Sequence, residues 1–234
     1  MNTHPGGEVL QITALTPSVR IFRIRYSLSN AFRPGQFVML DLPIQTEFTT
    51  RSYSIASAPN SDGWIELCIV KKPDGPGTSF LFEHIKEGDM LQVSEPQGKF
   101  VLEAETAPLC MVCTGTGIAP FRAMILDLRR RHTRLPMPLT LVFGNRFEED
   151  ILYREEWEQM QKLDPNFKFI PVLSREENWN GAKGYVHESY LPLAKAYPET
   201  HFYLCGWTTM VRDAKNKLKA LGFSRKQLKF ELYD

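Results

Sequence analysis

A short apolar run, a glycine-containing turn and a helical segment constrain this chain more than any other feature. Residues Leu109–Cys113 are uniformly apolar, as expected of a buried parallel strand. The turn Thr114–Gly117 (TGTG) follows at once, and Ile118–Arg131 has helical periodicity. Glycine in such a turn accepts positive φ and lets backbone N–H groups approach a ligand without an intervening Cβ. The helix N-terminus adds partial positive charge, so this context favours a nucleotide-binding turn over a merely tight loop.

The turn departs from the complete Gly-x-Gly-x-x-Gly fingerprint at one position. Pro120 stands where the third glycine would be. Proline suits the first helical turn, because its missing N–H has no acceptor to lose there. The departure points away from ordinary dehydrogenases.

Strand and helix signals divide the chain into two parts. Before residue 105, closely spaced strands are separated by turn residues, which suggests an antiparallel barrel or sandwich. After it, strands and helices alternate, which implies a parallel sheet with helices on both faces. We therefore expect two domains, 1–104 and 105–234. The expected strands are Glu8–Leu15, Val19–Ser27, Gln36–Leu42, Trp64–Val70, Met90–Glu95, Leu109–Cys113, Leu139–Gly144, Lys168–Leu173, His201–Cys205 and Leu228–Leu232; the expected helices are Ser79–His84, Ile118–Arg131, Arg154–Leu163 and Thr208–Leu221.

Composition and charge are those of an ordinary globular chain. Hydrophobic residues make up 43% and the formal net charge is +1, which argues against a dedicated nucleic-acid binder. No apolar stretch approaches the roughly 20 residues that span a bilayer, and no signal-peptide pattern is visible. We expect a cytoplasmic protein, a monomer or weak dimer, with reduced cysteines. Cys110 and Cys113 have redox spacing, but core packing is the stronger interpretation. The five histidines show no metal-ligand spacing, so no metal is predicted.

Four motifs occur in order along the chain. They are RSYSIAS at Arg51–Ser57, GTGIAP at Gly115–Pro120, CGW at Cys205–Trp207 and FELYD at Phe230–Asp234. Together they resemble the ferredoxin–NADP reductase superfamily. The resemblance implies an N-terminal flavin-binding antiparallel β-barrel and a C-terminal nicotinamide-binding α/β domain with a five-stranded parallel sheet. It also implies an NAD(P)H-dependent flavoprotein reductase that transfers hydride between NAD(P)H and bound FAD.

On the flavin side, the resemblance assigns roles to one strand and one turn. It implies that Arg51 contacts flavin phosphate, that Tyr53 packs on the isoalloxazine or ribityl chain, and that Ser54 places its hydroxyl near flavin N5. The second phosphate segment is a turn before a short helix. The further implied flavin contacts are Ser52, Ile69, Val70, Lys71 and the turn residues Gly77, Thr78 and Ser79.

On the nicotinamide side, the resemblance assigns the pyrophosphate loop to Thr114, Gly115, Thr116 and Gly117, with Pro120 in the helix that follows. Cys205 and Gly206 match the family's Cys-Gly pair beside nicotinamide C4. Proline is the usual next residue, and this chain has Trp207.

The C-terminal motif completes the implied active site. Glu231 matches a glutamate that neighbours the active serine and cysteine, and it is the expected proton relay. Tyr233 matches the aromatic residue that stacks over the flavin. The expected catalytic residues are therefore Ser54, Cys205 and Glu231.

The residues after the third strand of the second domain bear on the choice between NADP and NAD. Ser174 and Arg175 offer a hydroxyl and a guanidinium, which suit a 2′-phosphate. Family members that use NADP also carry a Lys-x-Tyr nearby, which Lys183 and Tyr185 match. Glu176 and Glu177 would repel a phosphate if they pointed inward. We expect NADP, with NAD as the alternative.

The sequence says least about the electron acceptor. It has no four-cysteine cluster of the plant ferredoxin type, so we expect no fused iron–sulfur domain and an external acceptor. The leading hypothesis is single-electron transfer to a carrier protein such as a ferredoxin, a flavodoxin or an oxygenase component. A free-flavin or quinone reductase, and an electron-transfer subunit of a larger redox complex, are the alternatives. Basic residues of the first domain offer a surface for an acidic carrier: Arg33, Lys71, Lys72 and Lys99.

Overall fold

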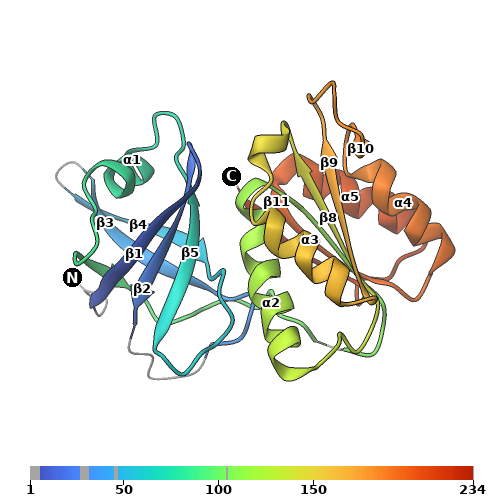
Figure 1. Cartoon of the computed structure of the whole chain (residues 1–234), viewed down its shortest axis with the longest axis horizontal. Helices are drawn as coiled ribbons and strands as arrows, with labels where there is room; N and C mark the ends of the chain where they lie inside the picture. The colour runs from blue at the N-terminus through green and yellow to red at the C-terminus, as the bar shows by residue number, and fades with distance from the viewer. Residues whose placement is uncertain (1–5, 27–31, 45–46, 104, 234) are drawn as a thin grey trace. The chain divides into compact units, whose positions relative to one another are not determined.

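The computed structural model of the protein describes residues 6–26, 32–44, 47–103 and 105–233. The chain divides into two compact units. One comprises residues 1–101 with 119–127, and the other comprises residues 102–118 with 128–234 (Figure 1). Ser27 and Ala104, the ends of an expected strand and of the first expected domain, lie outside the described residues.

The first unit is built on a six-stranded antiparallel sheet with strand order β4-β3-β6-β1-β2-β5. Ile55, directly after β4, bridges Leu67 of β5, so the two outer strands of the sheet meet and it closes toward a barrel. Alternate residues of β3 point inward, and Val38, Leu40 and Leu42 are all fully buried. The strands are β1 (Gly6–Thr16), β2 (Val19–Arg25), β3 (Phe37–Ile44), β4 (Glu47–Ser54), β5 (Trp64–Val70) and β6 (Met90–Val93), with one helix, α1 (Pro76–Glu83).

The second unit is built on a parallel sheet with strand order β10-β9-β8-β7-β11-β12. The described sheet has six strands, so the expectation of five was wrong. The additional strand, β10, has only two residues and therefore leaves no periodic signal in the sequence. The strands are β7 (Leu109–Thr114), β8 (Leu139–Asn145), β9 (Phe167–Leu173), β10 (Ala182–Lys183), β11 (His201–Trp207) and β12 (Leu228–Tyr233).

Helices cover both faces of this sheet (Figure 1). On one face, Trp157 of α3 packs on Phe167 and Phe169 of β9. On the other, α4 and α5 form a core with alternate strand residues such as Val172. Cys110 and Cys113 are fully buried in β7, which confirms their prediction as core residues. The helices are α2 (Ile118–Arg131), which follows the turn after β7, α3 (Arg154–Leu163), α4 (His187–Ala196) and α5 (Thr208–Ala220).

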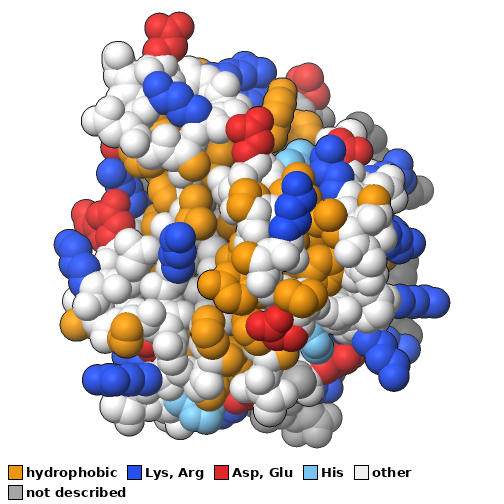
Figure 2. Space-filling view, turned by 90° about the vertical axis from the view of Figure 1, so that its right-hand side faces the viewer, with side chains coloured by type: hydrophobic (Ala, Val, Ile, Leu, Met, Phe, Trp, Pro, Cys, Tyr) orange, Lys and Arg blue, Asp and Glu red, His pale blue; other side chains and the backbone are white. Residues whose placement is uncertain are grey.

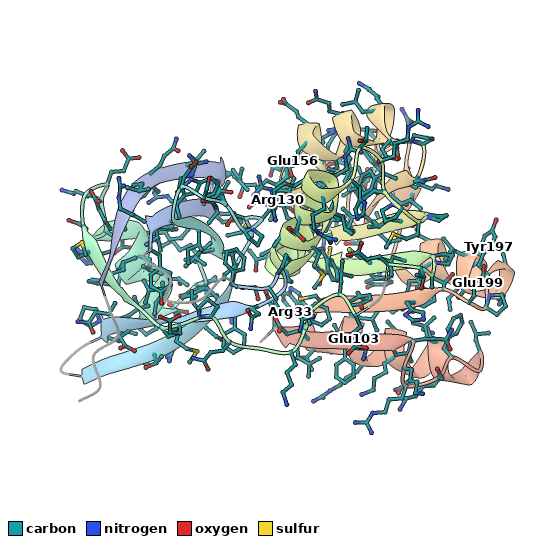
Figure 3. The ribbon with its side chains drawn as sticks, turned by 90° about the horizontal axis from the view of Figure 1, so that it is seen from below. Arg33, Glu103, Arg130, Glu156, Tyr197 and Glu199 are labelled. Carbon is teal, nitrogen blue, oxygen red and sulfur yellow. The ribbon has the colours of Figure 1, made fainter. Side chains whose placement is uncertain are left out.

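The edge strand β12 is tied to the residues that lead into this unit. The Lys229 ammonium lies 2.7 Å from the carboxylate of Glu103. The Glu103 backbone N–H donates to the Tyr203 hydroxyl of β11 at 3.3 Å (Glu103 is labelled in Figure 3). These contacts join the start of the unit to its last two strands.

Candidate active site

The predicted flavin residues Arg51–Ser54 lie on β4. In register, Arg51 pairs with Leu40 and Tyr53 with Val38 of β3. The Arg51 and Ser52 side chains are exposed, Tyr53 is half-buried against the barrel core, and Ser54 is buried. Burial raises the pKa of Tyr53 to about 12, against the opposing effect of Arg51, so its phenol is a neutral hydrogen-bond donor at physiological pH.

Helix α1 begins beside Arg51, a predicted phosphate contact. No side chain caps the helix N-terminus at Gly75, and the first turn carries no acidic residue. Gly77 is buried there, and a Cβ on it would lie 3.1 Å from Leu42 Cδ1 and 3.7 Å from Arg51 Cγ. The aliphatic part of the Arg51 side chain and the uncapped N-terminus of α1 therefore lie close together at Gly77, where there is little space for a side chain. This arrangement fits a flavin phosphate.

Other predicted flavin residues already have partners within the unit. The Thr78 hydroxyl donates to the Gly75 carbonyl at 3.1 Å and accepts from the Lys72 N–H at 3.0 Å, so it shapes the turn. The Lys71 ammonium lies 2.8 Å from Glu83. Ile69 is 1% exposed and contributes its side chain to the core. Val70 and Ser79 are half-buried.

The nucleotide turn of the second unit uses its two glycines for different reasons. Gly115 has a φ of +53°, and nothing lies within 4 Å of a Cβ built on it, so the conformation alone requires glycine. Gly117 has an ordinary φ, but a Cβ there would lie 2.6 Å from the Cys205 carbonyl oxygen. The turn is therefore open on the side of Gly115 and packed tightly against β11 at Gly117, as a phosphate-binding turn requires.

The turn and β11 are also held together beyond Gly117. Gly206 has a φ of +125°, and a Cβ on it would lie 2.5 Å from Thr114 Oγ1. The Trp207 N–H donates to the same Thr114 oxygen at 3.1 Å. Thr116 is half-buried in the turn, and Pro120 is buried as the third residue of α2.

The predicted nicotinamide residues lie side by side at the carboxyl ends of three neighbouring strands. Cys205 of β11 pairs in register with Cys113 of β7 on one side and with Glu231 of β12 on the other. Tyr233 is two residues beyond Glu231 and hydrogen-bonds the Cys205 side chain. The structure thus brings Cys205, Glu231 and Tyr233 together in the second unit, while Ser54 belongs to the first.

Cys205 is a neutral thiol in this setting. Its side chain is fully buried, and burial first, then the charge of Glu231, raises the pKa of the thiol well above its usual value. A thiol that stays protonated is not a nucleophile at physiological pH. The structure therefore shows Cys205 as a buried, neutral thiol beside Glu231 and Tyr233.

The residues predicted for a 2′-phosphate follow β9 (Ser174 and Arg175) or lie at and after β10 (Lys183 and Tyr185). Ser174 and Arg175 are exposed, and their backbone N–H groups donate to the carbonyls of Asn145 and Arg146, each at 3.0 Å. This pairing places Arg146 beside Arg175. No ion-pair partner of either guanidinium is found among the described residues. Lys183 instead donates to the Glu177 carbonyl at 2.8 Å, and Tyr185 is 73% exposed.

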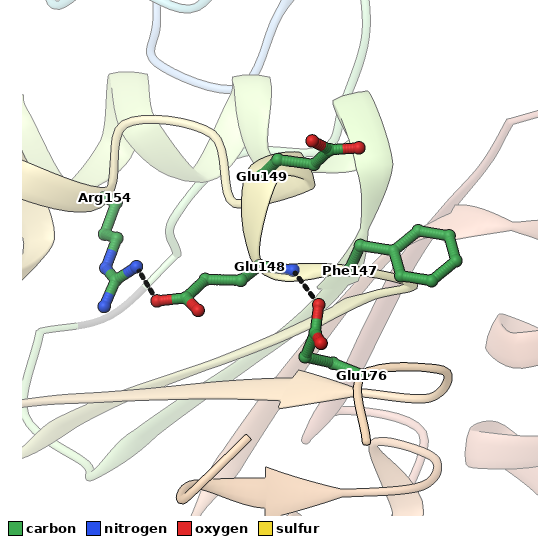
Figure 4. Close-up of a pocket in the computed structure, with 5 residues that line it drawn as sticks. All are labelled: Phe147, Glu148, Glu149, Arg154 and Glu176. Carbon is green, nitrogen blue, oxygen red and sulfur yellow. Dashed lines mark hydrogen bonds and ion pairs between the residues drawn. The ribbon is translucent and has the colours of Figure 1, made fainter. Parts of the chain in front are cut away.

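A hollow of about 510 Å³ lies beside this arginine pair. It is lined by Phe147, Glu148, Glu149, Arg154 and Glu176 (Figure 4). Glu148 forms an ion pair with Arg154, and the Glu176 carboxylate accepts the Glu148 N–H at 3.4 Å. Two of the three carboxylates thus have partners, and among the described residues none of the three pairs with Arg146 or Arg175.

The sequence prediction missed Arg146. The available signal was its position two residues after the expected strand Leu139–Gly144, which is followed along the chain by the expected strand Lys168–Leu173. Carboxyl ends of adjacent parallel strands meet at one edge of a sheet, which is where ligands bind in open α/β folds.

Comparison with known proteins agrees with this division of tasks. Residues 7–102 match the oxidoreductase FAD-binding domain, and residues 111–216 match the oxidoreductase NAD-binding domain. A ferredoxin–NADP reductase B from Sorangium cellulosum is 33% identical, with 97% of this chain and 96% of that protein covered. The phenol hydroxylase P5 protein of Acinetobacter pittii is 31% identical over 90% of this chain, which spans 60% of that relative's length. A ferredoxin NADP+ reductase structure from Neisseria gonorrhoeae with bound FAD and NADP has a TM-score of 0.84 and 25% identity, covering 99% of both chains.

Fold and site together define an NAD(P)H-dependent flavoprotein reductase, with FAD bound by the first unit and the nicotinamide nucleotide by the second. The chain belongs to the ferredoxin–NADP reductase family. None of its described helices is both long and apolar enough to cross a membrane.

Proposed function

We propose that this reductase takes hydride from NADPH and delivers single electrons to an external acidic carrier protein. The observation that carries the nucleotide choice is the arginine pair Arg146 and Arg175 beside Ser174. Two guanidinium groups and a hydroxyl offer the charged, directional donors that a 2′-phosphate accepts. The adenosine ribose of NAD lacks the 2′-phosphate, so these donors contribute little to the binding of NAD.

The residues of each unit support distinct parts of the reaction. Bound FAD would supply the conversion of a two-electron hydride donor into single-electron delivery. Arg51 and the start of α1 would hold its phosphates, with Tyr53 against the ring or ribityl chain and Ser54 as the donor near N5. The Thr114–Gly117 turn would hold the nicotinamide nucleotide's pyrophosphate, and Glu231 would move a proton between its carboxylate and solvent.

The nucleotide choice is tested by comparing kcat/KM for NADPH and NADH. Arg175→Ala and Arg146→Ala should each lower the NADPH value by roughly 10- to 150-fold, the equivalent of about 1.5–3 kcal/mol for a charged hydrogen bond. The NADH value should change little. Arg134→Ala is the matched control, because Arg134 is an exposed arginine of the same unit away from these strand ends. An NADH preference in the wild type would contradict the proposal.

Charge distribution supports an acidic carrier. Residues 208–233 contain seven Lys or Arg against two carboxylates, a net of +5, so the other 208 residues carry −4. Figure 2 shows Lys and Arg side chains around the margins of the face it presents, with hydrophobic side chains toward its middle. Of the basic residues expected in the first unit, Lys71 is engaged by Glu83. Such a segment favours encounter with an acidic protein, at a rate that falls with ionic strength.

A panel of acceptors tests the carrier. We expect NADPH-dependent reduction of an acidic [2Fe–2S] ferredoxin or a flavodoxin, slowed by added salt. The combined charge reversal of Lys217, Lys219, Arg225 and Lys226 should slow it further while ferricyanide reduction is unchanged. Reversal of Lys72 and Lys99 tests the surface expected from the sequence. Efficient turnover with free FMN or a quinone, and none with protein carriers, would replace this proposal with a free-flavin or quinone reductase.

A further inference from the structure

Trp207 is a large apolar side chain left in solvent at the most constrained point of the second unit. Its side chain is 60% exposed, although the preceding residues of β11 are buried. The backbone that leads into it is fixed by the Trp207 N–H, which donates to Thr114 Oγ1, and by Gly206, whose φ is positive. An exposed indole on a rigid backbone contributes little to folding, because its apolar surface stays in water.

The indole reaches across the end of a neighbouring strand. Strand β7 lies between β8 and β11 in the sheet, and its end carries the nucleotide turn. The Arg146 guanidinium, beyond the end of β8, lies 6.0 Å from the centroid of the Trp207 ring, which belongs to β11. The indole and the guanidinium therefore meet above the strand end from which the turn begins, within cation–π distance.

This position lies between two parts of the proposed nucleotide site. On one side of Trp207 is the Thr114–Gly117 turn, which fits the pyrophosphate. On the other is Arg146, which is linked by a backbone hydrogen bond to Arg175. A dinucleotide held by both parts has its adenosine half between them, where the flat face of the indole and the adenine ring can stack.

We propose that Trp207 is a specificity-determining residue that binds the adenine ring of the nicotinamide nucleotide, with Arg146 orienting the indole. The inference rests on the nucleotide site described above, and it concerns the adenine rather than the 2′-phosphate. Stacking explains both the exposure of the ring and its contact with an arginine that has no carboxylate partner among the described residues. The nicotinamide half of the nucleotide, which would lie beside Cys205, does not need the indole for binding.

Binding of nucleotide fragments to the purified protein, measured by calorimetry, tests this role without turnover. The probes are 2′,5′-ADP, which lacks nicotinamide, and nicotinamide mononucleotide, which lacks adenine. Trp207→Ser should raise the Kd for 2′,5′-ADP roughly 5- to 150-fold, the range given by base–aromatic stacking at one tenfold per 1.4 kcal/mol. Trp207→Phe keeps a flat ring and should stay near the wild-type value. Binding of nicotinamide mononucleotide should be unchanged in both variants.

Fluorescence gives an independent readout. Titrating the wild type with 2′,5′-ADP should quench tryptophan emission, and the quenching should disappear in Trp207→Phe. Equal binding of 2′,5′-ADP by the wild type and Trp207→Ser would overturn the inference, as would a loss confined to nicotinamide mononucleotide. If 5′-AMP binds as tightly as 2′,5′-ADP, the NADPH proposal fails, and Trp207→Ser must then weaken 5′-AMP for the stacking role to stand.

Discussion

Gly115 and Gly117 stand two residues apart in the nucleotide turn, and the structure predicts opposite responses to the same substitutions. A Cβ at position 117 would lie 2.6 Å from the Cys205 oxygen and 2.8 Å from the Gly206 Cα, both backbone atoms. Neither atom can move without shifting β11, which is paired on both sides. At position 115 the space is open, and only the φ of +53° opposes a side chain.

The magnitudes follow from these two causes. Overpacking against a fixed backbone costs about 1–3 kcal/mol, and we expect the upper value for Gly117→Ala. For a chain of this size each kcal/mol lowers the unfolding midpoint by about 2–4 °C, so the shift should be about 6–12 °C. Gly115→Asn should cost about 1 kcal/mol or less, because asparagine visits the left-handed region more readily than other non-glycine residues.

Thermal unfolding of four variants provides the assay. At position 115, asparagine should be tolerated better than alanine, because the positive φ determines the cost of the substitution there. At position 117, asparagine should destabilise the protein more than alanine, because the volume of the side chain determines the cost of the substitution there. NADPH binding should weaken in the Gly117 variants even below their midpoints, since the turn must shift. The reasoning is refuted if Gly117→Asn is as stable as Gly115→Asn.

Three further outcomes follow from contacts within each unit. Glu66→Ala removes a buried carboxylate that lies 2.7 Å from the Arg23 guanidinium and 2.7 Å from the Arg122 guanidinium, which is 13% exposed. Urea unfolding should show a loss of about 3–5 kcal/mol, and a loss typical of exposed pairs would contradict this. Because burial raises the pKa of the Cys205 thiol, iodoacetamide at mildly alkaline pH should label it only after unfolding, and prompt native labelling in peptide mass spectra would disprove this. A hydrogen bond from Arg131 lowers the pKa of the Glu105 carboxyl in the folded protein. The stabilisation that Glu105 gives is therefore present above its pKa in the unfolded chain and is lost as the pH falls through its pKa in the folded protein. Glu105→Gln should lower the free energy of unfolding by at most about 1 kcal/mol at neutral pH and not at all in acid, and a loss that is the same at every pH would contradict this explanation.

Elements with strong local signals were predictable from the sequence. The bounds of β5, α2 and α3 coincide with the expected ranges, because each has a clear apolar period or run. Helix α4 was missed: its interior contains Pro192, and no side chain caps its N-terminus. Strand β4 was also not predicted as an element, since its Thr, Arg and Ser residues have no apolar run. Its pairing with β3 is what makes it a strand.

The candidate site was predictable as a set of residues but not as a set of contacts. The sequence pattern offered two reasons for glycine in the turn, and only the structure assigns positive φ to Gly115 and close packing to Gly117. Lys183 looked equivalent to Arg175 as a phosphate ligand, yet its ammonium group donates to the Glu177 carbonyl. Arg146 carried no motif of its own. These differences depend on long-range pairing, which local sequence does not encode.

The order of strands in the second unit separates the residues proposed for nucleotide choice from those proposed for hydride chemistry. Cys205, Glu231 and Tyr233 lie at the ends of β11 and β12, whereas Arg146 and Arg175 follow β8 and β9, with β7 and its turn between the two groups. Substitutions at the β8 and β9 ends should therefore change KM for one nucleotide and leave kcat unchanged, because they alter binding that is equal in ground and transition states. Trp207 is the exception, since it starts on β11 and ends beside Arg146. Trp207 therefore connects the two groups of residues, because its backbone follows Cys205 and its ring contacts Arg146. The effects of substituting Trp207 and Arg146 on nucleotide binding should be non-additive for that reason.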